Sequence, residues 1–181
     1  VADPQLADEV VLHSEYSLQS TREAILSLGA AAKRQNKAHK VILMVDLGDL
    51  REGVYCRDRR RILALAEETI SQEGLELVGI GANLTCFGGI LPDDANLAVL
   101  LEIARSIRSR FGIPLPIVSG GNSSSLHLLF EGRLPRGINH LRVGEGLLLG
   151  MDTAVGKPFP FLSQRVFTLR ARLVEVYSKP S

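Results

Sequence analysis

The sequence has no tryptophan, few aromatic residues and no long apolar run, and its two cysteines lie far apart. The spacing of Cys56 and Cys86 is not typical of a metal site, and no segment before them has the pattern of a signal peptide. No apolar run approaches the length needed to span a bilayer. We therefore expect a cytoplasmic protein without a membrane partner and without a metal.

The charge is nearly balanced, which argues against a further class of function. The chain has 21 Lys and Arg residues against 20 Asp and Glu residues, a formal net charge of +1. Binding to nucleic acid needs a basic surface, so no nucleic acid partner is expected. With 181 residues, 45% of them apolar, the chain is long enough for one sizeable core but short of two full domains.

Apolar runs rich in β-branched residues, each closed by glycine or a polar turn, predict five strands. They cover residues 10–12, 41–45, 75–80, 115–118 and 138–143. Apolar residues at three- and four-residue steps predict helices, which cover residues 21–34, 62–70 and 97–111. Asp93 and Asp94 precede the last helix and are suited to cap it. This α/β alternation requires parallel strands joined by right-handed crossovers.

Two parallel architectures fit the alternation, an open doubly wound sheet and a (β/α)8 barrel of the TIM type. A full barrel needs about 250 residues, so a barrel would be present in this chain only in part. Residues 167–173 alternate between apolar and polar side chains. That pattern predicts a strand with one solvated face, and hence a change of architecture near the end of the chain.

Polar, glycine-rich segments follow the predicted strands. In parallel architectures, ligands bind at the carboxyl ends of strands. The segments are residues 13–17, 46–53, 81–89, 119–125 and 142–146. Because several strand ends carry Asn, Ser, Arg, Asp and Gly, we expect one convergent site.

The segment SGGNSSS, residues 119–125, has two functional readings. A phosphate needs backbone N–H groups and hydroxyl donors at the start of a helix, which Ser123 and Ser124 would supply beside the amide of Gly144. A nucleophilic serine needs an activating base, and neither a catalytic triad nor a nucleophile elbow is recognisable. A plain helix cap at Asn122 is compatible with the phosphate site. The phosphate reading is favoured over the nucleophile.

Two arginines at strand ends have both a functional and a structural reading. Arg142 would point into the site, or it would form an ion pair with Glu145 or another carboxylate. Arg51 would bind a substrate carboxylate with its planar guanidinium, or it would be a solvated loop charge beside Glu52. The residues alone leave both choices open.

Five motifs taken together resemble the pyridoxal-phosphate-dependent amino-acid racemases built on an alanine-racemase-type barrel. They are MVDLGDLREGV, GIGANLTCFGG, LPDDANL, VSGGNSSSL and INHLRVGEGLLLG, and the resemblance covers most of the chain. The ornithine racemase branch is the most similar. The resemblance implies a (β/α)8 barrel that binds pyridoxal 5'-phosphate, with a following β domain that completes a dimer. Residues 1–160 would then be a partial barrel, and residues 161–181 would hold the first strand of the C-terminal β domain.

The resemblance also implies roles for the phosphate-binding residues. Asn122 and Ser123 match the phosphate loop of the family, and Ser124 follows them in the same turn. Gly144 and Glu145 match residues whose backbone amides bind the same phosphate.

Three further residues match the ring end and the substrate end of the family's site. Arg142 matches the arginine that faces the pyridine nitrogen, where a cation disfavours protonation of the ring. Arg51 matches a residue near the substrate carboxylate and is the candidate catalytic residue. Asn83 occupies a position where relatives commonly have histidine beside the ring.

The family's Schiff-base lysine and its second base, a tyrosine, have no match in this chain. The lysine would lie on a strand upstream of Val1, and Lys40 precedes its own strand, at the opposite end of the sheet. We therefore expect an internal part of a racemase, inactive by itself, that forms a homodimer or associates with the rest of the barrel. Acidic residues such as Asp46, Asp49 and Glu145 would suit a cationic amino acid such as ornithine.

Two other functions remain open from the sequence. One is a non-catalytic module that binds pyridoxal phosphate or another phosphorylated ligand. The other is an unrelated barrel that acts on a sugar phosphate, for which the same phosphate site would serve.

Overall fold

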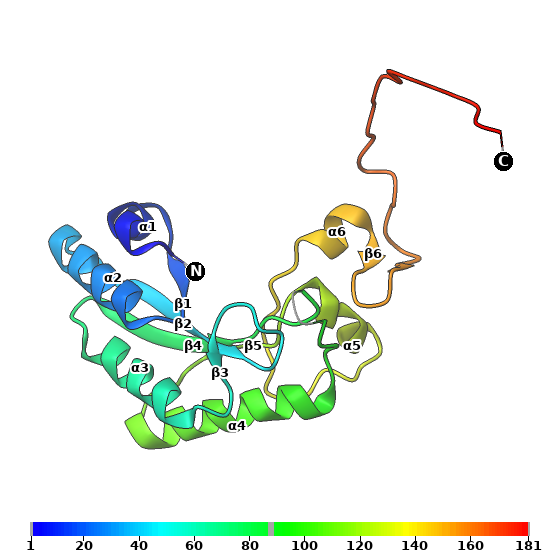
Figure 1. The fold of residues 1–181 in the computed structure, drawn as a ribbon. Helices are drawn as coiled ribbons and strands as arrows, with labels where there is room; N and C mark the ends of the chain where they lie inside the picture. The colour runs from blue at the N-terminus through cyan, green and yellow to red at the C-terminus, as the bar shows by residue number, and fades with distance from the viewer. Residues whose placement is uncertain (1, 87–88, 181) are drawn as a thin grey trace.

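The computed structural model describes residues 2–86 and 89–180. Its centre is a parallel sheet in the order β1-β2-β4-β5, with the short strand β3 beside β2 (Figure 1). The strands are β1 (Tyr16–Gln19), β2 (His39–Asp46), β3 (Val54–Tyr55), β4 (Leu75–Gly81) and β5 (Ile117–Ser119). The predicted parallel α/β architecture is confirmed.

Three helices, α2 (Arg22–Gln35), α3 (Arg59–Ser71) and α4 (Asp94–Phe111), connect the strands and cover one face of the sheet (Figure 1). The helix α1 (Ala7–His13), after the 3-10 turn η1 (Pro4–Leu6), precedes β1 and packs against α2. After β5 the chain forms η2 (Ser123–Ser125), α5 (Leu126–Phe130), α6 (Glu145–Leu149) and the small hairpin of β6 (Met151–Asp152) and β7 (Lys157–Pro158). No helix among the described residues is both long and apolar enough to cross a membrane.

The two faces of the sheet bury different sets of side chains. Successive residues of a strand point to opposite faces. In β2, Val41, Leu43 and Val45 therefore join the large core beneath the helices. Ile42 and Met44 belong to a separate small cluster on the other face. A cavity of about 450 Å3 is lined by Tyr16, Leu18, Ile42, Ile117, His140 and Arg142.

The helix α4, which has 18 residues, shows why the local predictions succeeded. The Asp93 carboxylate accepts a hydrogen bond from the Asn96 amide at 2.7 Å, and the Asn96 side chain accepts one from the Asp93 amide at 3.1 Å. This reciprocal capping satisfies amides that the first turn leaves without partners. The helix ends at Gly112, whose φ of +65° is a left-handed conformation favoured by glycine.

The strand predicted at residues 10–12 is wrong, because these residues lie in α1. Ala7 and Val11, four residues apart, are its buried positions and pack against α2. A three-residue apolar run is too short to separate a helical from a strand period. The first strand is Tyr16–Gln19, so the segment 13–17 lies at the amino end of a strand and not at a ligand-binding end.

The strand predicted at residues 138–143 is reduced to one parallel bridge between Ser119 and His140. The side chain of Asn139 replaces part of the expected ladder. Its Oδ1 accepts a hydrogen bond from the Val118 amide at 2.9 Å, and its Nδ2 donates to the Pro116 carbonyl at 2.7 Å. The chain still passes beside β5, so His140 and the residues after it reach the same edge as the other strand ends.

The strand predicted at residues 167–173 does not form in the described part of the chain, where residues 159–180 contain no helix or strand. Leu169 is 94% exposed and Val174 is 96% exposed. A strand needs a neighbour to pair its backbone groups, and this segment runs away from the rest of the molecule (Figure 1).

Candidate functional site

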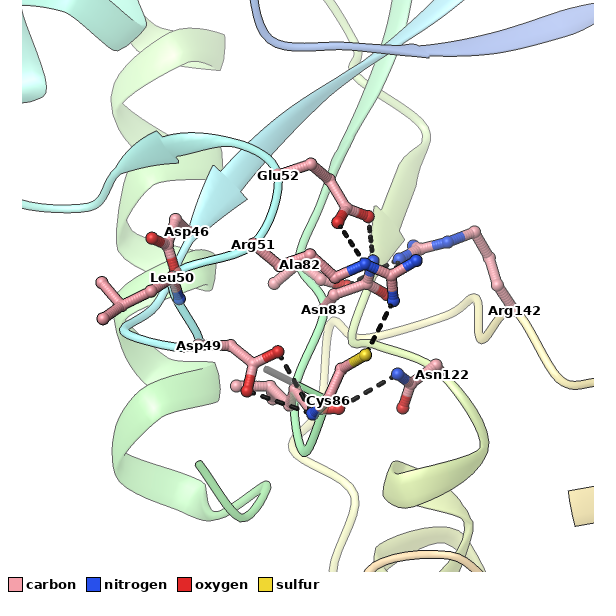
Figure 2. A network of polar contacts seen from close by, with 11 residues as sticks. Asp46, Asp49, Leu50, Arg51, Glu52, Ala82, Asn83, Cys86, Asn122 and Arg142 are labelled. Atoms are coloured by element: carbon pink, nitrogen blue, oxygen red, sulfur yellow. Dashed lines mark hydrogen bonds and ion pairs between the residues drawn. The ribbon is translucent and has the colours of Figure 1, made fainter. Parts of the chain in front are cut away.

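Loops from three strand ends and from the segment after His140 meet at one end of the sheet (Figure 2). Asn122 Nδ2 donates to the Leu84 carbonyl at 3.0 Å, and the Arg142 amide donates to the Gly121 carbonyl at 3.0 Å. The predicted convergence is therefore observed for segments 46–53, 119–125 and 142–146 and for the described part of 81–89. Phe87 and Gly88 lie outside the described residues.

Ser123 lies between two backbone amides of the α6 segment. Its Oγ accepts hydrogen bonds from the Gly144 amide at 3.2 Å and from the Gly146 amide at 2.9 Å. A Cβ at Gly146 would come within 2.9 Å of Leu126 Cδ1 and 3.2 Å of Ser123 Cβ, so the close approach of α6 to η2 favours glycine there. A hydroxyl and two amides thus gather at one point, from segments about twenty residues apart.

Asn122 and Ser124 shape the turn that presents Ser123. Asn122 caps η2, because its Oδ1 accepts a hydrogen bond from the Ser124 amide at 3.0 Å. The Ser124 hydroxyl contacts Asn122 Oδ1 at 2.6 Å and the Leu84 carbonyl at 3.1 Å, and the residue is 1% exposed. The cap reading of Asn122 and the phosphate reading of Ser123 are compatible in the same turn.

Arg142 is held by three acceptors from two neighbouring strand ends. Its Nη1 donates to Ser119 Oγ at 2.5 Å, and its Nη2 donates to the Ala82 carbonyl at 2.8 Å and to Asn83 Oδ1 at 2.6 Å. Burial lowers the pKa of the Arg142 guanidinium, an effect that Glu52 opposes and Arg51 reinforces. No ion pair joins Arg142 to the exposed Glu145 in the described structure.

Glu52 links Arg51 to Asn83 beside this arginine (Figure 2). Its Oε2 pairs with Arg51 Nε at 3.0 Å, while its Oε1 accepts a hydrogen bond from Asn83 Nδ2. The Arg51 side chain is 49% exposed, and its Nη1 lies 3.3 Å from Cys86 Sγ. Arg51 thus has a carboxylate partner and still presents part of its guanidinium to solvent.

The loop that carries Arg51 is organised by buried carboxylates. Asp46 Oδ1 accepts hydrogen bonds from the Gly48 amide at 2.8 Å and the Leu50 amide at 3.1 Å, and Asp49 accepts one from the Cys86 amide at 3.2 Å. Asp46 and Asp49 are only 8% and 1% exposed. They were expected to attract a cationic substrate at the mouth, but their carboxylates instead shape the loop.

Ser119 contacts both Arg142 and His140. Its hydroxyl oxygen accepts from Arg142 Nη1 at 2.5 Å and lies 2.9 Å from His140 Nδ1, where either group can be the donor, depending on the tautomer of His140. Burial, and secondly the charge of Arg142, lower the pKa of His140.

Sequence reasoning missed Glu52, Ser119 and the carbonyls of Ala82 and Leu84 as parts of the site. In the sequence, Glu52 is recognisable only as a charge beside Arg51. Backbone carbonyls leave no mark in a sequence. Ser119 had a usable signal, since it is the last residue of a buried strand in the segment already singled out.

Two lysines with ion-pair partners, Lys33 and Lys40, lie away from this end of the sheet. Lys40, at the start of β2, pairs with Glu15 at 2.5 Å, and Lys33 of α2 pairs with Glu73 at 2.5 Å. The predicted position of Lys40 at the amino end is confirmed. Within residues 2–86 and 89–180, no three His, Cys, Asp or Glu side chains gather as metal ligands would.

Comparison with known proteins finds one family domain and two amino-acid racemases that are similar to this chain. The model of the alanine racemase N-terminal domain matches residues 2–151. An ornithine racemase of Acetoanaerobium sticklandii is 45% identical over 174 residues, which cover 96% of this chain and 49% of that protein. A lysine racemase of Thermotoga maritima is 36% identical over 173 residues, covering 96% of this chain and 47% of that protein.

Among solved structures, PipY of Synechococcus elongatus with PLP bound has the same fold. Its TM-score is 0.61 at 18% identity, over 80% of this chain and 65% of that one. The chain spans about half the length of the curated relatives it matches.

Proposed function

Because the chain belongs to the family of the alanine racemase N-terminal domain, we propose that its site binds pyridoxal phosphate and serves the racemisation of a cationic amino acid. The observation that carries the proposal is the grouping of Ser123 with the amides of Gly144 and Gly146. The names of the relatives, ornithine racemase and lysine racemase, support the substrate class.

The donor set fits the phosphate of this cofactor. A phosphate accepts hydrogen bonds and carries negative charge, so it is bound by hydroxyls and by convergent backbone N–H groups. Ser123 Oγ accepts hydrogen bonds from the Gly144 and Gly146 amides, so its own hydroxyl proton is left to donate to a phosphate oxygen. Gly146 lets the two segments approach closely. We assign Asn122, Ser123, Ser124, Gly144 and Glu145 to the phosphate end of the site.

Arg142 and Asn83 suit the ring end. When bound, pyridoxal phosphate draws electrons from the α carbon of an amino acid and so acidifies its α proton. A guanidinium cannot accept a hydrogen bond, so Arg142 facing the ring nitrogen disfavours protonation of that nitrogen. Its three acceptors fix the guanidinium in place without cofactor.

Arg51 is proposed to bind the substrate carboxylate. Its half-exposed guanidinium retains donors beyond the pair with Glu52. Since Asp46 and Asp49 are buried in their loop, the cationic substrate class is supported by the names of the relatives and not by these carboxylates. We further propose a cytoplasmic enzyme in which residues 161–181 begin a β domain and a homodimer, or association with further barrel strands, completes the site.

The experiment is a titration of the native gene product with pyridoxal phosphate, followed by absorbance and by chiral chromatography of ornithine and lysine. Ser123→Ala is expected to weaken cofactor binding about 10-fold, as loss of one hydrogen bond to a charged group does. Ser106→Ala is the matched control, because Ser106 is an exposed serine of α4 whose hydroxyl bonds only its own helix.

Failure of the native protein to bind pyridoxal phosphate would overturn the proposal. Binding without conversion of any amino acid would favour the non-catalytic module instead. Tight binding of a sugar phosphate with no response to pyridoxal phosphate would favour the third function.

A further inference from the structure

The carboxamide of Asn83 lies between one group that only accepts hydrogen bonds and one that only donates them. Its Nδ2 donates to Glu52 Oε1, and its Oδ1 accepts from Arg142 Nη2 at 2.6 Å. An ionised carboxylate has no proton to donate, and a guanidinium has no lone pair to offer. Only one orientation of the amide satisfies both neighbours. The reverse orientation would place NH2 against Arg142 and oxygen against Glu52.

Glu52 connects this amide to a second cation. Its other oxygen, Oε2, pairs with Arg51 Nε at 3.0 Å, and its side chain is 16% exposed. One carboxylate therefore contacts Arg51 directly and Arg142 through Asn83, as Figure 2 shows. Asn83 is 7% exposed, so little water is available to replace either bond.

The position of Glu52 is itself fixed by the loop after β2. Gly53, the next residue, has a φ of +116°, and a Cβ there would lie 2.6 Å from the Asp46 amide nitrogen. The loop thus packs closely against the end of β2, where Asp46 Oδ1 accepts hydrogen bonds from the loop amides of Gly48 and Leu50.

We propose that Glu52 is a positioning residue that orients Asn83 and thereby fixes the positions of Arg142 and Arg51 relative to each other. The inference rests on the proposed function, in which Arg142 faces the cofactor ring and Arg51 the substrate carboxylate. Glu52 acts through these residues and touches neither ligand.

The test is an exchange of the two polar groups. Glu52→Gln leaves an NH2 group to face either Asn83 Nδ2 or Arg51 Nε, and Asn83→Asp sets two carboxylates against each other. In the double variant, the introduced carboxamide would donate to the introduced carboxylate and accept from Arg51, while that carboxylate accepts from Arg142. The net charge of the double variant equals that of the native protein.

Each single variant is expected to weaken pyridoxal phosphate binding and lower kcat/KM about 10-fold, because a network of charged groups is broken. The double variant is expected to recover to within about 3-fold of the native protein. Affinity for inorganic phosphate should stay unchanged in all three, since that site is at Ser123. Glu68→Gln is the matched control. Glu68 Oε2 pairs with Arg22 Nε at a distance of 2.9 Å, and this ion pair does not belong to the site.

The same cycle is also measured by urea unfolding of the cofactor-free native gene product, so that it can be interpreted even if the proposed function fails. Lowered midpoints for both single variants, and recovery in the double variant, would support the orientation role without any activity. The inference is overturned if Glu52→Gln behaves like Glu68→Gln in both measurements, or if the losses of the two single variants simply combine in the double variant.

Discussion

At the scale of single residues, the Ser119 hydroxyl couples a histidine to an arginine. It accepts from Arg142 at 2.5 Å and lies 2.9 Å from His140 Nδ1. Protonation of His140 would set a second cation near Arg142. The charge of Arg142 therefore lowers the pKa of His140, in addition to the effect of burial.

The pKa values of His140 and of the buried His39 are both lowered, chiefly by burial. The unfolded chain then binds more protons than the folded one below the ordinary histidine value of 6.5. Stability is expected to be complete above that pH and to fall as the pH drops towards the folded-state values. Urea unfolding between pH 8 and pH 5, with NMR titration of both histidines, measures this.

His140→Asn should reduce this pH dependence and leave the part due to His39. A native protein whose unfolding midpoint is constant over this range would contradict the assignment. So would a titration of His140 above the ordinary value.

At the scale of elements, α4 is stabilised by a reciprocal cap that is independent of the site. Asp93→Ala removes the acceptor for the Asn96 amide and is expected to lower the free energy of unfolding by about 1 kcal/mol. Asp94→Ala, one residue on, removes only a charge in the first turn and should cost about 0.5 kcal/mol or less. Chemical denaturation distinguishes the two.

A loss for Asp93→Ala no larger than for Asp94→Ala would show that the cap contributes little. Cofactor binding should be unchanged in both variants, because α4 contributes no residue to the site described above.

Elements with strong local signals were the predictable part of this fold. The helix α4 has a cap, a buried stripe and a terminal glycine within its own sequence. The error at residues 10–12 arose because three apolar residues suit a helix and a strand equally. The reduction of the strand at 138–143 depends on the Asn139 side chain bonding across to β5, a tertiary contact with no local pattern.

The candidate site was predictable to the extent that topology brings strand ends together. Arg142, Ser123 and Gly144 were singled out because each lies at or just after the end of a predicted strand, even where that strand proved irregular. Glu52 was not found, because a charged residue in a glycine-containing loop usually faces solvent. Its function depends on which acceptor and which donor flank Asn83, and that is determined only by the folded arrangement.

At the scale of the whole molecule, the two ends of the sheet carry different kinds of polar contact. Exposed ion pairs such as Lys40–Glu15 lie at the amino ends of the strands and contribute little to stability. The buried bonds of Arg142 and Ser123 lie at the carboxyl ends. Substitutions at the first end should be tolerated, whereas those at the second should affect ligand binding.

The sheet of the described chain is open, and its second face is apolar. β1 pairs with β2 alone, and Leu18 of β1 lines the same cavity as Ile42 and Ile117. An unpaired strand edge beside an apolar face favours association. A polypeptide of these 181 residues, with a mass of 19.7 kDa, is therefore expected to elute as an oligomer in size-exclusion chromatography with light scattering.

Leu18→Lys should shift this polypeptide towards the monomer, because it places a charge in the middle of the edge strand and on the apolar face. Leu12→Lys is the matched control, since Leu12 is 55% exposed on α1 and lines no part of the cavity. A native polypeptide that is monomeric at every concentration would contradict the prediction. Equal dissociation by both variants would show that the contact is not at the open face of the sheet. The two variants make the same Leu→Lys change and differ only in its location.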